Sequence, residues 1–222
     1  MKTDAQIQQD VIEELKWQPF IHASEIGVAV KNGIVTLTGT VDTYAKKLAA
    51  ELAAKKIAGV KAVAEDIEVK LPGSLRKTDA EIAEAVLNAL KWHSAVQEEK
   101  IKIKVEKGWV SLQGEAEWEF QKAAARDAIE NLSSVIGVTD NIIITPRVTA
   151  TDIKAKIILA LQRSANLDAE RIKIETIGNK VILTGKVRSL AEKKDAAKAA
   201  WMAPGVKVIE NNLEIASEIY AL

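Results

Sequence analysis

The chain of 222 residues has no cysteine, only four prolines, 4% aromatic residues and no excess charge of either sign. Without cysteine, a disulfide framework, a thiol nucleophile and a cysteine-based zinc site are excluded. The 31 basic and 31 acidic side chains cancel, which argues against a dedicated nucleic-acid-binding protein because such proteins carry a basic excess. No apolar run approaches the roughly 20 residues that span a bilayer, so we expect no transmembrane segment.

The first residues, Met1-Lys2-Thr3-Asp4, lead directly into a polar, periodic stretch. A secretory signal has a continuous apolar core and a small-residue cleavage site, and neither pattern occurs here. There is also no cysteine that a lipid could modify. We therefore expect a cytoplasmic location for the chain as written, with a periplasmic location as the alternative if the natural N-terminus differs.

What the chain does contain is an internal repeat. Residues 3–17 read TDAQIQQDVIEELKW and residues 78–92 read TDAEIAEAVLNALKW, an offset of 75. A further offset of 71 reaches a third copy, and both offsets hold without a gap from the first helix to the last strand. Because a fixed period indicates repeated structural units, we predict three domains, spanning residues 1–71, 76–146 and 148–217.

Each copy has the same predicted order of elements, α-β-β-α-β. Apolar residues spaced by four, such as Ile7, Val11 and Leu15, give the first helix one apolar face. Two strands with alternating apolar residues are joined by a tight turn, and an alanine-rich helix leads to the third strand. The predicted fold class is α+β: three tandem small domains, each with two helices packed on one face of a three-stranded mixed sheet.

The repeat resembles a known family through the motif Val-x-Leu-x-Gly followed by an alanine-rich helix and Gly-Val. Copy one has it as residues 33–39, then Ala49 and Ala53, then Gly59-Val60. Copy three repeats it in residues 181–187 and 204–208, whereas copy two has Ser134 in place of the second glycine. This pattern resembles the BON domain family of bacterial envelope and stress proteins, and looks most like the multi-BON proteins related to osmotically inducible protein Y.

The resemblance implies a binding module for phospholipid surfaces or envelope components, often under osmotic stress. It implies no catalytic activity, no cofactor and no acid–base residue. The residues agree with that expectation, because His22 and His93 occupy different repeat positions without further ligands nearby. We therefore predict that the protein is not an enzyme and has no catalytic, cofactor-binding or metal-binding residues.

The third copy differs from the others in charge. Residues 1–71 have 9 basic and 10 acidic side chains, residues 72–147 have 10 and 12, and residues 148–222 have 12 and 9. Five basic residues around the start of its second helix are candidates for contact with an anionic surface: Lys186, Arg188, Lys193, Lys194 and Lys198. The alternative is a solvated helix face, since Glu192 and Asp195 lie among them.

Three tryptophans are candidate interface residues. Trp17 and Trp92 end the first helix of copies one and two, where copy three has Arg163. We favour packing of these two side chains against the core or a neighbouring domain, with anchoring in a lipid headgroup layer as the alternative. Trp109 is expected on the open face of the second sheet, where an exposed aromatic indicates a domain or partner contact.

Two hypotheses follow for function. The first is a non-enzymatic, stress- or envelope-associated binding protein, whose tandem modules contact anionic phospholipid surfaces peripherally with an affinity raised by avidity. The alternative is a soluble protein–protein interaction or scaffold module of the osmotic stress response, which contacts protein partners or itself through the open sheet faces. Nucleic acid is not an expected partner, because no aromatic stacking residues accompany the basic cluster.

Overall fold

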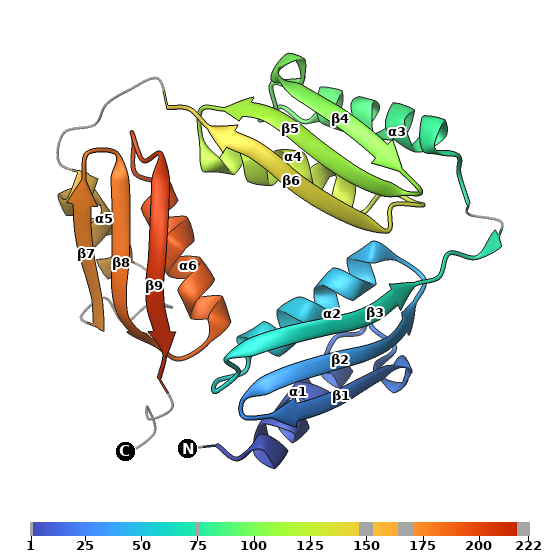
Figure 1. The fold of residues 1–222 in the computed structure, drawn as a ribbon, viewed down its shortest axis with the longest axis horizontal. Helices are drawn as coiled ribbons and strands as arrows, with labels where there is room; N and C mark the ends of the chain where they lie inside the picture. The colour runs from blue at the N-terminus through green and yellow to red at the C-terminus, as the bar shows by residue number, and fades with distance from the viewer. Residues whose placement is uncertain (1, 74–75, 147–152, 164–170, 217–222) are drawn as a thin grey trace. The chain divides into compact units, whose positions relative to one another are not determined.

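The computed structural model describes residues 2–73, 76–146, 153–163 and 171–216, which form three successive modules (Figure 1). Each module has a three-stranded sheet whose strands lie in chain order. In the second and third modules the first two strands pair antiparallel and the last two pair parallel. The predicted fold class, three tandem α+β domains with mixed sheets, is therefore confirmed.

Corresponding elements begin and end at equivalent repeat positions. The first module contains α1 (Asp4–Trp17), η1 (Ala23–Glu25), β1 (Ile26–Lys31), β2 (Ile34–Val41), α2 (Tyr44–Lys56) and β3 (Ala62–Val69). The second contains α3 (Asp79–Trp92), η3 (Glu98–Lys100), β4 (Ile101–Glu106), β5 (Trp109–Ala116), α4 (Glu119–Glu130) and β6 (Gly137–Ile144). The third contains α5 (Ile153–Gln162), β7 (Ile172–Ile177), β8 (Lys180–Val187), α6 (Leu190–Trp201) and β9 (Val208–Ile215).

Each module has a small core between its helices and one sheet face. In the third module the core joins the apolar stripe of α5, the alanines of α6 and alternate residues of the strands, among them Ile157, Ala196 and Leu183. Because Val181, Leu183 and Val187 all point to this side of β8, both helices pack on the same face. The opposite face of the sheet is left open.

The N-termini of α1 and α3 form capping boxes. The Thr78 hydroxyl accepts from the Glu81 backbone N–H, and the Thr78 backbone N–H donates to the Glu81 carboxylate at 2.8 Å. That backbone hydrogen bond, together with one from the Thr78 hydroxyl, lowers the pKa of Glu81. The equivalent helix of the third module begins beside residues outside the described part of the chain.

The carboxylate at the first helical position holds the hairpin turn. Asp79 accepts hydrogen bonds from the backbone N–H groups of Lys107 and Gly108 at 2.8 and 2.9 Å, and Asp4 does the same in the first module. Lys107 adopts a φ of 51° and Gly108 a φ of 80°, the left-handed conformations that a tight two-residue hairpin requires. The carboxylate therefore helps a lysine to occupy a turn position that asparagine fills in the first module.

Ser134 marks the point where copy two departs from the family motif. It adopts a φ of 71°, close to the 94° of Gly59 and the 85° of Gly205 at the equivalent positions. The side chain is buried, and its hydroxyl accepts a hydrogen bond from the Lys77 backbone N–H at 3.1 Å. The turn after the second helix is therefore retained, and the serine adds a link to the start of the module.

Replacing Thr78 by alanine is expected to destabilise the start of α3. The variant loses the cap of the Glu81 N–H, which typically costs about 1 kcal/mol. Hydrogen exchange of the α3 amides, followed in the full chain, should therefore accelerate about fivefold. Thr78→Ser is the matched control and should exchange like the native chain, whereas unchanged exchange in Thr78→Ala would show that the cap contributes nothing.

Candidate functional site

Trp17 and Trp92 end α1 and α3 with their side chains in solvent. Their exposed fractions are 81% and 85%, so neither side chain caps the core of its own module. The interpretation that we favoured from the sequence, packing against the core or a neighbouring domain, is therefore wrong in its first part. The hydrophobic stripe of each helix is complete without them, because Leu15 and Leu90 fill the last core positions.

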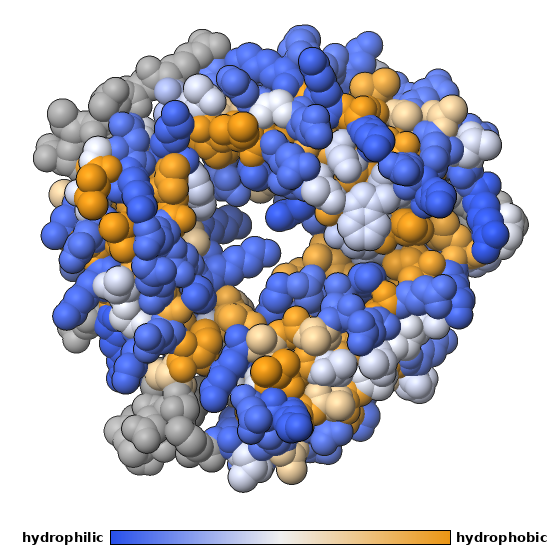
Figure 2. All heavy atoms as spheres, viewed as in Figure 1, coloured by the Kyte–Doolittle hydropathy of each residue, from blue (hydrophilic) through white to orange (hydrophobic). Residues whose placement is uncertain are grey.

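The apolar surface around Trp17 extends along the chain. Phe20, three residues further, is 53% exposed, whereas Ile21 is buried. In the second module, Leu87 on the same helix as Trp92 is 52% exposed. On the face seen in Figure 2, apolar side chains occur as patches among hydrophilic ones. The first two modules therefore expose large apolar side chains on or beside their first helix, and hydrophilic side chains surround them.

Two of the five basic candidates of the third module have contacts inside it. The Lys193 ammonium donates a hydrogen bond to the Leu213 carbonyl of β9 at 2.7 Å. Arg188 forms an ion pair with Glu192 at 3.2 Å, and Glu192 also accepts from the Arg188 backbone N–H. Glu192 is 6% exposed, so its charge requires a partner. Both basic residues therefore have structural roles.

The other three candidates lie on two different faces. Lys186 is exposed on β8 and precedes the buried Val187, so its side chain points to the open sheet face. Lys194 and Lys198 are exposed on α6, one turn apart, on the helical side of the module. The structure thus brings Lys194 and Lys198 together, but does not place all five residues on one surface.

Trp109 lies on the open face of the second sheet, as its alternation with Val110 predicts. It is 45% exposed, and its indole Nε1 donates a hydrogen bond to the Thr139 hydroxyl on β6 at 2.8 Å. A side chain at Gly137 would collide with the indole ring, so the ring lies flat over that strand. Ile143 extends the apolar surface further along β6, with an exposed fraction of 63%.

A charged pair accompanies Trp109 on this face. The Lys104 ammonium donates to the Glu106 carboxylate at 2.8 Å, and this hydrogen bond raises the pKa of Lys104. Glu106 is the cross-strand partner of Trp109. The open face of the second module therefore combines an aromatic and an aliphatic side chain with a polar margin, a composition typical of protein contact surfaces.

Within the described ranges, no group of three or more His, Asp or Glu side chains is arranged to hold a metal ion. None of the helices that the structure describes is long and apolar enough to cross a bilayer.

Comparison with known proteins identifies the class of protein. The BON domain family model matches residues 3–70, 78–146 and 149–217. The chain therefore belongs to the BON domain family and contains three tandem copies of that domain. A search of curated proteins finds no match.

Two solved structures of Chlamydia trachomatis CdsD, a structural protein of the type III secretion system, are among the similar structures. One is 13% identical with a TM-score of 0.25 and covers 92% of this chain and 90% of its own. The other, a C-terminal domain, is 14% identical with a TM-score of 0.26 and covers 96% and 98%. Similarity at this level carries no argument about the function of this chain.

Sequence reasoning missed Ile143 as a surface residue. The signal was present in the run Ile142-Ile143-Ile144, because alternation along a strand must turn the middle side chain away from the core. It also misread Lys193, whose equivalent in the second module, Lys122, donates to the Ile142 carbonyl at 2.7 Å. A lysine at the same position of successive copies indicates a role in the shared fold rather than in one copy's binding surface.

We predict that Lys193→Ala destabilises the third module whereas Lys194→Ala does not. Lys193 loses a charged hydrogen bond to β9, a change of about 1.5 kcal/mol, and exchange of the β9 amides should accelerate about tenfold. The exposed Lys194 should change stability by less than about 0.5 kcal/mol. Equal exchange in both variants would contradict the structural role of Lys193.

Proposed function

We propose that the chain is a non-enzymatic, envelope- or stress-associated binding protein whose BON modules contact anionic phospholipid surfaces peripherally. The observation that carries the proposal is the exposure of Trp17 and Trp92, above 80%, at the same repeat position. Exposing two large indoles to water is unfavourable, and the headgroup layer of a bilayer accommodates an aromatic ring with a polar N–H.

Electrostatics supports the same proposal in the third module. The tryptophan position is taken there by Arg163, and Lys194 and Lys198 extend from the exposed side of α6. Each cation near an anionic membrane contributes about 1 kcal/mol of attraction. In this proposal, the first two modules contact the phospholipid surface through tryptophan side chains, and the third module contacts it through positive charge.

Tandem arrangement supports useful affinity from weak individual contacts. Once one module is bound, the linkers keep the next within a short distance of the surface, which raises its effective concentration. Avidity requires only that the linkers allow simultaneous contact. The proposal therefore predicts that changes in two modules reduce binding more than changes in one.

Co-sedimentation with vesicles tests the proposal. The full chain should bind vesicles that contain phosphatidylglycerol and not vesicles of phosphatidylcholine alone. Replacing Lys194 and Lys198 by glutamine should weaken binding about 30-fold at low salt, from about 1 kcal/mol per charge, and less at physiological salt. Lack of binding to phosphatidylglycerol vesicles at low salt would overturn the proposal.

The aromatic contribution should respond differently to salt. Trp17→Ala and Trp92→Ala should each weaken vesicle binding about tenfold at every salt concentration, from about 1.5 kcal/mol of lost apolar burial per side chain. Leu87→Ala is the matched control, because Leu87 is exposed on α3 but lies away from its end. If Leu87→Ala weakens binding as much as Trp92→Ala, the helix end is not the anchor.

A second candidate function is contact with protein partners or with a second copy of the chain, and the open face of the second module favours it. Trp109 and Ile143 form its apolar part. If this face mediates self-association, light scattering should detect oligomers of the native chain and monomers of Trp109→Ala. Phe120→Ala, an exposed aromatic on α4, is the control; a native chain that is strictly monomeric and captures no partner argues against this function.

A further inference from the structure

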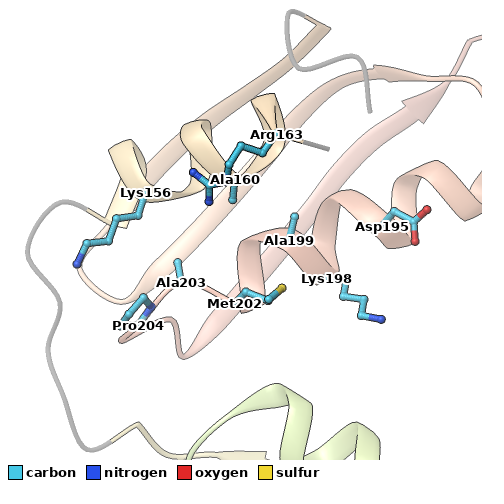
Figure 3. Close-up of a pocket in the computed structure, with 9 residues that line it drawn as sticks. All are labelled: Lys156, Ala160, Arg163, Asp195, Lys198, Ala199, Met202, Ala203 and Pro204. Carbon is cyan, nitrogen blue, oxygen red and sulfur yellow. The ribbon is translucent and has the colours of Figure 1, made fainter. Parts of the chain in front are cut away.

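A groove of about 590 Å³ runs between α5 and α6 on the helical side of the third module (Figure 3). Three cationic side chains and one carboxylate line it: Lys156, Arg163, Lys198 and Asp195. Between them lie small or apolar residues, including Ala160 and Met202. In Figure 3, Lys156 lies at the end of the groove near Pro204 and Arg163 lies further along α5, whereas Asp195 and Lys198 extend from α6.

The first module has the same two helices, but their residues at this place differ. Its residues at the positions of Ala160 and Met202 are Glu14 and Lys56, which form an ion pair of 3.3 Å between α1 and α2. The position of Lys156 is taken by Asp10. A charged pair therefore bridges the two helices where the third module has an alanine and a methionine.

The second module also lacks the basic lining. Ala85, Trp92 and Asp127 stand at the positions of Lys156, Arg163 and Lys198. The three modules share a fold, so the fold by itself does not require cations here. The basic lining is specific to the third module and has a net positive charge, with exposed cations and small or apolar residues between them.

These features select the chemistry of a ligand. Its volume lies within the usual range for small-molecule sites, which combine an apolar lining with a few placed polar groups. The Arg163 guanidinium suits a phosphate or carboxylate, with which it forms strong charge-assisted hydrogen bonds, and Lys156, about 10 Å away along the helix, adds positive charge to the groove. Alanine and methionine provide an apolar, adaptable surface for a hydrocarbon chain.

We propose that the groove between α5 and α6 binds one anionic single-chain amphiphile, with its head near Arg163 and its chain over Ala160 and Met202. This goes beyond peripheral contact with a bilayer, because the ligand is a single molecule held between two helices. The groove is separate from Trp17 and Trp92 but shares Arg163 and Lys198 with the proposed membrane contact, so the experiments below measure binding of the amphiphile and binding to vesicles separately.

Calorimetric titration of the full chain with dodecyl phosphate, below its micelle concentration, tests the proposal. Inorganic phosphate supplies the head without the chain, and dodecylphosphocholine supplies the chain with a zwitterionic head. Dodecyl phosphate should bind at least about tenfold more tightly than either, since each probe lacks one part of the recognition. Amide shifts in a labelled chain should change in α5 and α6. If inorganic phosphate binds as tightly as dodecyl phosphate, the groove does not bind the hydrocarbon chain. If dodecylphosphocholine binds as tightly as dodecyl phosphate, the cations do not recognise the head.

The decisive variant transfers the ion pair of the first module into the groove. Ala160→Glu with Met202→Lys leaves the net charge unchanged and recreates a pair that α1 and α2 already accommodate. Dodecyl phosphate binding should be lost, whereas binding to phosphatidylglycerol vesicles should persist. Unchanged dodecyl phosphate binding would overturn the proposal.

Single substitutions keep the test valid if the double variant does not fold. Arg163→Gln changes an exposed side chain at the helix end and should weaken dodecyl phosphate binding about tenfold or more, the usual effect of removing a charged hydrogen bond. Lys194→Gln removes the same charge from the same module outside the groove and should have no effect. Equal weakening by both variants would indicate general electrostatic attraction and overturn the groove as the site.

Discussion

In each module, a glycine of the second strand lies very close to the backbone that leads into the first strand, and the fold depends on this contact. A Cβ atom at Gly114 would overlap the Lys100 carbonyl oxygen, and Gly114 has a φ of 145°. Gly39 and Gly185 meet the same constraint in the other copies. Only glycine combines this φ with so close an approach. The contact aligns the first two strands, and that register turns alternate residues such as Leu112 into the core.

With the scaffold held by such recurring contacts, the surfaces of the three copies are free to differ. Trp17 and Trp92 give two modules an exposed aromatic at the end of the first helix, and Arg163 gives the third a cation. The ion pair between Glu14 and Lys56 bridges α1 and α2 in the first module. In the third module, a groove lies between the equivalent helices, α5 and α6. Comparison between copies therefore separates residues that build the fold from residues that distinguish one module.

Much of the fold was predictable because the repeat supplies three observations of one pattern. The helix stripes, the capping at Thr3 and Thr78 and the orientation of Trp109 all follow from spacing. The basic cluster was less predictable. Closeness in sequence suggested one surface, but strand alternation sends Lys186 to the open sheet face, and the reach of its side chain lets Lys193 bond to β9.

The sequence by itself determined the three copies, their α+β order and the family, because periodicity and turn residues are local properties of a chain. The tertiary structure decided which polar and aromatic residues remain available. Leu15 completes the core without Trp17, Glu192 pairs with Arg188, and Lys156 and Lys198 line one groove from α5 and α6. These outcomes depend on packing between helices and strands far apart in the chain, which no local spacing specifies.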